Sequence, residues 1–241
     1  MNNKYSGFIF IILFVLLIVV QPVMGDEGGD SLIGNVSVEL RKIGREEMVE
    51  LRSLAGKLGW QLGFDSEHKV VFINNRGNSL KLSLHSGELD GEKLREFPEI
   101  VGGRTYLGIN ELRELIKRIG SGKEPELLTG LYTDRREYPR GEEITVHIRA
   151  YNISGREVNL NFSSGQKYDL YLMKGEEEVW RWSEGKFFTM ALVRKTLEPG
   201  GVLKYEVKLP EELEKGEYLL RGELVTVEEP LILNSLKIKV L

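Results

Sequence analysis

One short segment of the sequence carries side chains suited to binding another molecule. It runs from Ser183 to Met190, SEGKFFTM, and includes Lys186, Phe187 and Phe188. A rigid exposed loop that presents a large apolar anchor is well suited to enter a cleft on a partner. We therefore take Lys186, Phe187, Phe188 and Met190 as the candidate binding residues. In the alternative interpretation, favoured because aromatic side chains are mostly buried, Phe188 packs beneath a sheet and Phe187 covers its edge.

Side chains of catalytic types are present, but not in a catalytic pattern. Ser163 and Ser164 precede Gly165, and a serine nucleophile needs a neighbouring base and an orienting acid. His147 has no visible link to these serines, which are expected to form a turn. Asp169 is more simply explained as an acceptor in a turn than as a catalytic carboxylate. We therefore expect a protein that is not an enzyme, with no catalytic residues and no cofactor.

A metal site is not expected either. The chain contains no cysteine, which excludes disulfides and thiolate ligands. The three histidines, His68, His85 and His147, lie far apart in the sequence, whereas copper favours clustered imidazoles. We interpret all three as ordinary surface or edge residues.

Composition limits the class of protein. The chain has 241 residues, of which 41% are hydrophobic and 29% charged, enough for two small domains or one large one. A net charge of -4 gives no electrostatic reason to expect a nucleic-acid partner, since such partners favour a basic surface.

The first residues have the layout of a secretory signal peptide. Lys4 precedes an unbroken apolar run at residues 8–20, and Gln21 and Pro22 end it before Gly25. The run is shorter than the ~20 residues that span a bilayer, so we expect cleavage after Gly25, with an uncleaved membrane anchor as the alternative. Residues 1–25 are then the signal peptide and residues 26–30 a polar spacer. The remainder is expected to be exported, either secreted or associated with the cell envelope.

Residues 31–120 are predicted to form an α+β domain, a small antiparallel sheet with two helices. Residues 46–58 and 110–119 have helical spacing of apolar residues, with Asn110 as an N-cap. Residues 74–78, NNRGN, are a strong hairpin signal. A weak internal repeat is also visible, because Val49, Leu51 and Leu54 have the spacing of Leu107, Ile109 and Leu112.

Residues 121–126, SGKEPE, are predicted to be a linker, and residues 127–241 an all-β domain. Short alternating segments separated by turns every ten or so residues are typical of an antiparallel sandwich. Trp180 and Trp182 are expected on one strand face. We favour a buried core position for both over a binding surface.

The first domain resembles the copper amine oxidase N-terminal-like domain. The resemblance is carried by residues 49–55, 58–60, Asp65, 70–73, 103–107 and Leu112. That family usually has proline where Glu50 and Gly108 stand, so both copies of its V-P-L-R signature are altered. The resemblance implies an accessory module of the cell envelope rather than a catalytic copper domain.

The second domain resembles the BsuPI family of intracellular proteinase inhibitors. The matching residues are 161–166, 168–170, 179–183, 185–186, 188–189, 191–192, Leu197, 199–200 and 216–218. The resemblance implies an immunoglobulin-like β-sandwich and the ability to bind a subtilisin-type serine proteinase. This chain differs from the founding members in its signal peptide and its added N-terminal domain.

Two functions follow from these features. In the first, the chain is an exported, non-catalytic protein whose BsuPI-like domain binds a protein partner, a serine proteinase of the subtilisin type. In the alternative, it is a cell-envelope accessory module that binds wall polymer or a neighbouring protein without inhibition. Contact with a membrane is expected only through an uncleaved signal segment.

Overall fold

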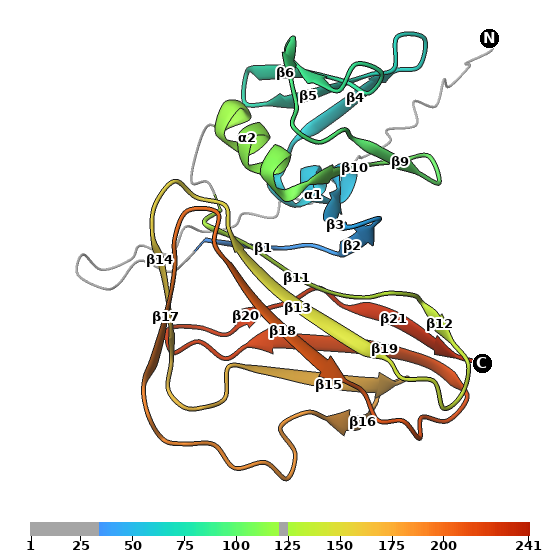
Figure 1. Cartoon of the computed structure of the whole chain (residues 1–241), viewed down its shortest axis with the longest axis vertical. Helices are drawn as coiled ribbons and strands as arrows, with labels where there is room; N and C mark the ends of the chain where they lie inside the picture. Colours follow the sequence, from blue (N-terminus) through green and yellow to red (C-terminus); the bar gives the residue numbers. More distant parts are fainter. Residues whose placement is uncertain (1–33, 121–124) are drawn as a thin grey trace, which may run out of the picture. The chain divides into compact units, whose positions relative to one another are not determined.

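The computed structural model describes residues 34–120 and 125–241 (Figure 1). The expected signal peptide, the spacer and residues 121–124 of the expected linker lie outside the described residues. Among the described helices, none is both long and apolar enough to cross a membrane.

Two strand–helix units form the first part of the described chain. β3 (Glu46–Glu50) leads directly into α1 (Leu51–Leu58), and β10 (Arg104–Gly108) leads directly into α2 (Ile109–Ile119). β3 and β10 pair antiparallel with Val49 opposite Leu107. β2 (Leu40–Ile43) and β9 (Glu99–Val101) flank them, in the order β2-β3-β10-β9. The repeat expected from the sequence is thus a repeated strand–helix unit.

A five-stranded antiparallel meander lies between these two units along the chain. It comprises β4 (Gln61–Asp65), β5 (Val70–Asn75), β6 (Asn78–Ser83), β7 (Glu88–Leu89) and β8 (Glu92–Lys93). Arg76 and Gly77 have φ values of 46° and 93°, the left-handed conformation that a two-residue hairpin turn requires. The predicted hairpin at residues 74–78 is therefore confirmed.

Two helix boundaries differ from the prediction. Residues 46–50 form a strand, because their backbone pairs with both β2 and β10 and buries Met48 and Val49. The N-cap of α2 is Gly108 rather than Asn110. The predicted buried face of α2 is confirmed, with Leu112, Leu115 and Ile119 buried.

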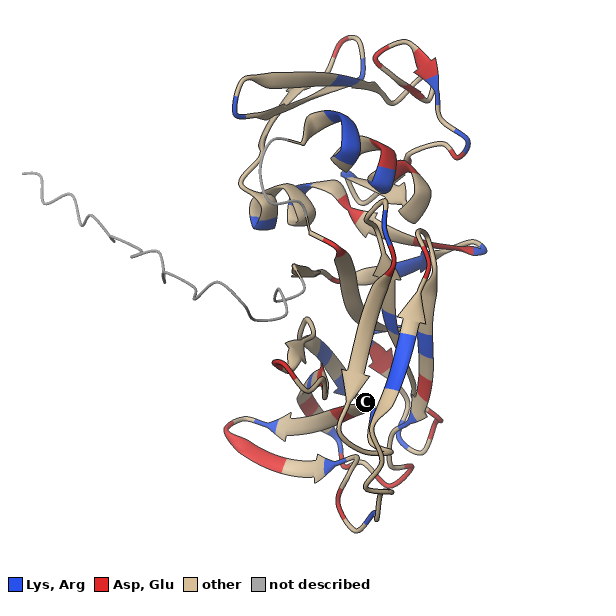
Figure 2. Cartoon of the chain, turned by 90° about the vertical axis from the view of Figure 1, so that its left-hand side faces the viewer, with Lys and Arg blue, Asp and Glu red and all other residues tan. Residues whose placement is uncertain are grey.

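The second part is a β-sandwich (Figure 1, and turned by 90° in Figure 2). One sheet has the order β1-β11-β13-β18: Asn35–Ser37, Leu127–Thr133, Thr145–Asn152 and Val202–Lys208. The other has the order β12-β21-β19-β15-β16: Glu137–Tyr138, Leu236–Val240, Gly216–Leu224, Tyr168–Lys174 and Glu177–Arg181, with β20 (Leu231–Ile232) on β19. β14 (Val158–Phe162) and β17 (Val193–Leu197) form a separate pair.

The sequence predicted an antiparallel sandwich, but two of its strand pairs are parallel. β1 pairs parallel with β11, and β12 pairs parallel with β21. Both added strands lie at the edge of a sheet, where a strand from elsewhere in the chain can join without displacing a neighbour.

Apolar side chains form two clusters. The first fills the sandwich, where Ile148 and Leu131 of one sheet belong to the same buried cluster as Leu172 of the other. The second joins β1–β3, α1, α2 and the meander to Leu128, Tyr132 and Tyr151 of the sandwich. Residues 34–120 and 125–241 accordingly belong to one compact unit.

Candidate functional site

The segment between β16 and β17, residues 182–192, is the most exposed apolar part of the described chain, and we call it the 182–192 loop. After a turn at residues 182–185 it has no helix or strand until β17, and Figure 1 shows it running along the end of the sandwich. Phe187, Met190 and Leu192 are 101%, 94% and 80% exposed. Such exposure is unusual for three large apolar side chains so close together and is typical of an interaction site.

The buried carboxylate of Asp169 holds the start of the loop. Asp169 lies on β15 and is 3% exposed. Its Oδ2 accepts a hydrogen bond from Ser183 Oγ at 2.6 Å, and its Oδ1 accepts one from the Ser183 backbone N–H at 3.1 Å. The Arg181 guanidinium lies 3.8 Å away. Asp169 therefore serves as an acceptor that fixes a turn, as the sequence favoured.

A column of aromatic rings supports the middle of the loop. Trp182 contacts Tyr168 with ring centroids 4.2 Å apart, and Phe188 contacts Trp182 at 5.7 Å. Tyr205 continues the column at 4.8 Å from Tyr168. Burial raises the pKa of the Tyr205 phenol to about 12. The ammonium of Lys186 lies 3.8 Å from the Trp182 ring centroid, a favourable cation–π distance.

A third contact fixes the loop beyond Phe188. The backbone N–H of Gly165 donates to the Thr189 carbonyl at 2.8 Å. A Cβ at Gly165 would lie 2.8 Å from Thr189 Oγ1 and 3.2 Å from the Thr189 nitrogen, so a side chain at Gly165 would push the loop away. The turn at residues 163–166 is thus a structural support for the loop, and its glycine permits the close approach.

The predicted binding residues divide into two kinds. Phe187 and Met190 are exposed, whereas Phe188 is partly buried against Trp182 and Lys186 lies over the same ring. The sequence analysis also offered the interpretation that both phenylalanines pack onto the sheet. This is confirmed for Phe188, which contacts Trp182, and is wrong for Phe187, whose side chain is fully exposed. Leu192 is also exposed but was not among the predicted binding residues. Its apolar side chain, two residues after Met190, was the available signal in the sequence.

The tryptophans are less buried than expected. Trp180 and Trp182 pack against the sandwich cluster but remain partly exposed. They lie at the end of the second sheet, where β15 has only the short β16 as its neighbour on that side. A register shift at Leu172 and Met173 leaves Val179 without a partner in β15, so Val179 is 41% exposed.

A polar cluster unforeseen from the sequence links β3 to the sandwich. Glu47 Oε1 accepts from Arg149 Nε at 2.7 Å and from the Tyr132 hydroxyl at 2.6 Å, and Glu47 Oε2 accepts from the Tyr151 hydroxyl. Burial, and then the hydrogen bond to Glu47, raise the pKa of Tyr132. The one available signal was Arg149 itself, a charged residue in an otherwise mostly apolar strand.

The described histidines are not grouped. His68 contacts Asp65 at 2.7 Å, His147 stacks on Tyr132 with centroids 4.6 Å apart, and His85 is exposed. In residues 34–120 and 125–241, no three histidine, aspartate or glutamate side chains are placed to hold a metal ion.

No curated protein matches the chain. A crystallised β-glucosidase from Listeria innocua is 18% identical with a TM-score of 0.29, covering 51% of this chain and 17% of its own. The CARDB domain of a Pyrococcus furiosus protein is 9% identical with a TM-score of 0.30, covering 51% of this chain and 93% of its own. This chain thus spans less than a fifth of the glucosidase, and likeness at these scores carries no argument about function.

A family model gives a more specific result. The model described as BsuPI, intracellular proteinase inhibitor, matches residues 131–229. The match confirms the BsuPI resemblance predicted for the C-terminal half over these residues. The resemblance of residues 31–120 to the copper amine oxidase N-terminal-like domain stays a prediction. Residues 131–229, which hold the 182–192 loop and all three of its supports, match the BsuPI proteinase inhibitor family.

Proposed function

We propose that the protein binds and inhibits a serine proteinase by inserting the 182–192 loop into the enzyme's cleft. The observation that carries the proposal is the contrast between a fully exposed Phe187 and the fixed residues around it. Ser183, Phe188 and Thr189 are each held by the sandwich, while the side chain between them has no packing partner.

The energetics of binding favour this arrangement. Ordering a flexible loop on binding costs roughly 0.5–1.5 kcal/mol for each immobilised side chain. The supports at Asp169, Trp182 and Gly165 remove much of that cost before the partner arrives. Burying the Phe187 side chain in an apolar pocket would contribute about 1.5–3 kcal/mol.

The shape of Phe187 indicates which proteinases to test. A large aromatic anchor requires a deep apolar pocket on the enzyme, and it excludes enzymes that prefer a basic or small side chain. The family match supports a proteinase as the class of partner, and we propose a subtilisin-type enzyme with an apolar pocket as the first to test.

We infer further that the protein acts outside the cytoplasm and that residues 31–120, apart from the sandwich strand β1, form an α+β accessory domain. The apolar run at residues 8–20 and the break at Gln21 and Pro22 support export. The paired strand–helix units of β3–α1 and β10–α2 support the accessory domain.

Titration of a subtilisin with the purified chain tests the proposal. We expect residual proteinase activity to fall in proportion to added protein until a stoichiometric end point, with the chain uncleaved on a gel. Activity that does not change at a large molar excess of the chain, or steady digestion of the chain at the loop, would contradict inhibition.

A further inference from the structure

Met190 is the one strongly exposed methionine in the part of the chain that the structure describes. Its side chain is 94% exposed, whereas Met48 is 3% exposed and Met173 is partly buried on β15. A thioether reacts with an oxidant only when the oxidant reaches the sulfur, so exposure decides which methionine is oxidised first. Among these three methionines, Met190 is therefore the one most open to oxidation.

The composition of the chain removes the usual competitor for an oxidant. Cysteine thiolates are the other sulfur groups that peroxides oxidise in proteins, and the chain contains no cysteine. Its five methionines are then its only sulfur-containing side chains. A peroxide that attacks sulfur in this protein therefore acts on a thioether.

The backbone on both sides of Met190 is supported. The Thr189 carbonyl accepts a hydrogen bond from the Gly165 N–H at 2.8 Å, and β17, which pairs with β14, begins three residues after Met190. Met190 also lies three residues after the exposed Phe187, and three residues span at most about 10–11 Å of extended chain. A partner that covers Phe187 therefore has Met190 within reach.

Oxidation changes the character of this side chain. Met190 and Leu192 are the exposed apolar residues of the loop beyond Phe188, whereas a methionine sulfoxide is polar. When a polar oxygen is buried at an apolar contact, it loses its hydrogen bonds to water unless the partner supplies a donor. A contact that includes Met190 is therefore weakened when its sulfur is oxidised.

We propose that Met190 is a modification site for peroxides and that its oxidation weakens binding of the proteinase. One oxygen atom of the peroxide bonds to Sδ of Met190, the O–O bond breaks, and with a hydrogen peroxide molecule the other oxygen leaves as water. The sulfur loses two electrons and the peroxide gains them. The effect on the proteinase rests on the function proposed above, whereas the choice of Met190 rests on its exposure.

Peptide mass spectrometry of the full folded chain after treatment with hydrogen peroxide tests the site. We expect Met190 to gain one oxygen atom, about 16 Da, and to be fully converted while most of Met48 and Met173 is unmodified. The midpoint of thermal unfolding should not change, since the Met190 side chain is exposed. Conversion of Met48 or Met173 before Met190, or an unreactive Met190, would overturn the assignment.

Titration of a subtilisin with the oxidised chain, after removal of the peroxide, tests the consequence. The inhibition constant should rise by roughly tenfold or more, because the sulfoxide oxygen loses its water at the contact. Treatment with methionine sulfoxide reductases for both sulfoxide epimers should restore the starting value. Equal inhibition before and after complete conversion of Met190 would contradict the proposed effect.

Two variants, each compared with its own untreated sample, make this test specific. Met190→Leu has an apolar side chain without sulfur, so peroxide should leave its inhibition constant at whatever value it has before treatment. Met173→Leu retains Met190 and should lose inhibition on treatment as the wild type does. A loss in Met190→Leu as large as that in the wild type would show that another residue is responsible.

The two readouts separate this inference from the function proposed above. If the untreated chain does not inhibit the proteinase, the proposed function fails, and the proposed effect of oxidation on it fails too. The peptide masses still decide whether Met190 is the modified site. If the untreated chain inhibits and the fully oxidised chain inhibits equally, the proposed function stands and only the effect of oxidation fails.

Discussion

The Gly165 backbone N–H donates to the Thr189 carbonyl over 2.8 Å, with no room for a side chain between them. This contact joins the turn at residues 163–166 to the 182–192 loop, two segments that the sequence analysis treated separately. It fixes the chain two residues beyond Phe187. The loop therefore presents its exposed side chains from a supported backbone.

Replacing Gly165 with alanine tests that support. The new methyl group would lie 2.8 Å from Thr189 Oγ1, so the loop must shift, and we expect inhibition to weaken by about tenfold or more. Stability should fall by only about 1–3 kcal/mol, the usual cost of overpacking. The measurement is proteinase titration beside thermal unfolding. Gly155→Ala, where an added Cβ meets nothing within 4 Å, is the control, and equal inhibition by both variants would contradict the role of Gly165.

Asp169→Asn tests the first support of the loop. The amide retains one acceptor but loses the charge that faces Ser183 and Arg181. We expect the free energy of unfolding to fall by about 1–3 kcal/mol, because the buried partners lose a charged acceptor. Urea unfolding measures the change, and Asp134→Asn at an exposed position should stay within about 0.5 kcal/mol. Unchanged stability of Asp169→Asn would show that the carboxylate does not fix the turn.

Glu47→Gln tests the polar cluster between β3 and the sandwich. Arg149 is 5% exposed at its side chain, so removing the Glu47 charge leaves a buried cation with only the exposed Glu206 carboxylate, 3.7 Å away, as its counterion. We expect a loss of about 3–5 kcal/mol in the free energy of unfolding. Glu157→Gln, at an exposed position, is the matched control. A loss no larger than the control's would mean that the ion pair contributes nothing to joining the two parts.

Glu96→Gln tests a pair of carboxyl groups. Burial and the neighbouring Glu111 carboxylate raise the pKa of Glu96, while Glu111 Oε2 receives no hydrogen bond from a described donor. A raised pKa in the folded state means that protonated Glu96 stabilises the fold below its unfolded pKa. That contribution is lost as the pH rises through the folded value, so ionised Glu96 opposes folding at neutral pH.

The glutamine is uncharged and can donate to Glu111. At pH 7 we expect Glu96→Gln to exceed the wild type in stability by about 0.5–1.5 kcal/mol. The difference should shrink as the pH falls toward 4, where Glu96 is protonated in the wild type. Thermal unfolding across this pH range provides the measurement, with exposed Glu99→Gln as the control. A variant that is less stable than the wild type at pH 7 would disprove this account.

Local signals in the sequence predicted local structure well. Residues 74–78 were correctly assigned to a hairpin, in which Arg76 and Gly77 form the left-handed turn between the paired residues Asn75 and Asn78. Alternation located β13, β15 and β19, since each buries one face against the sandwich core. The start of α1 was misplaced because Met48 continues the helical spacing of Leu51 and Leu54 but is held in a strand by pairing on both sides.

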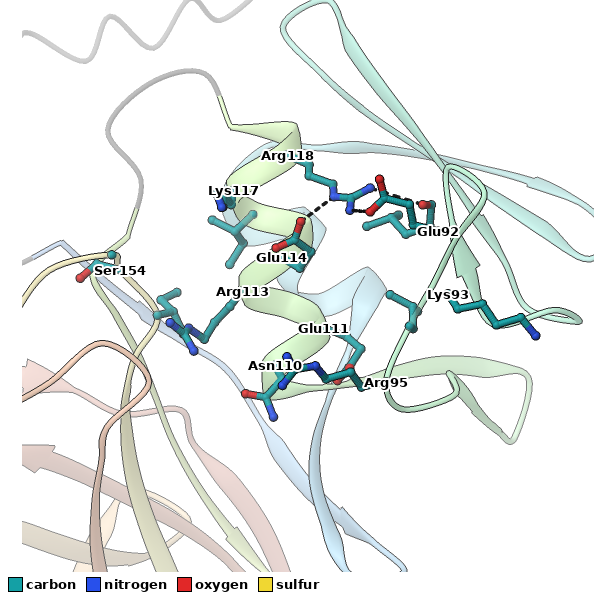
Figure 3. A pocket seen from close by; sticks show the side chains of 15 residues that line it. Glu92, Lys93, Arg95, Asn110, Glu111, Arg113, Glu114, Lys117, Arg118 and Ser154 are labelled. Atoms are coloured by element: carbon teal, nitrogen blue, oxygen red, sulfur yellow. Dashed lines mark hydrogen bonds and ion pairs between the residues drawn. The ribbon is translucent and has the colours of Figure 1, made fainter.

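Long-range features could not be predicted from the sequence. Glu47 and Arg149 are 102 residues apart, and the sequence around each residue does not indicate that they form an ion pair. A cavity beside α2 likewise combines Lys93, Arg113 and Ser154 from three separate segments (Figure 3). Phe187 and Phe188 are adjacent and of one type, yet only Phe188 meets Trp182, so their different exposure depends on how the loop is supported.

The most direct test of the central claim is the titration of a subtilisin with Phe187→Ala. Phe187 is fully exposed, so the variant should fold as the wild type does, and thermal unfolding checks this. As a hot-spot anchor, its removal should cost at least about 2 kcal/mol of binding free energy, roughly a 30-fold weaker inhibition. Phe64→Ala, at a phenylalanine that is 57% exposed on β4, should inhibit like the wild type. Inhibition by Phe187→Ala equal to that by the wild type would contradict the proposed role of the loop.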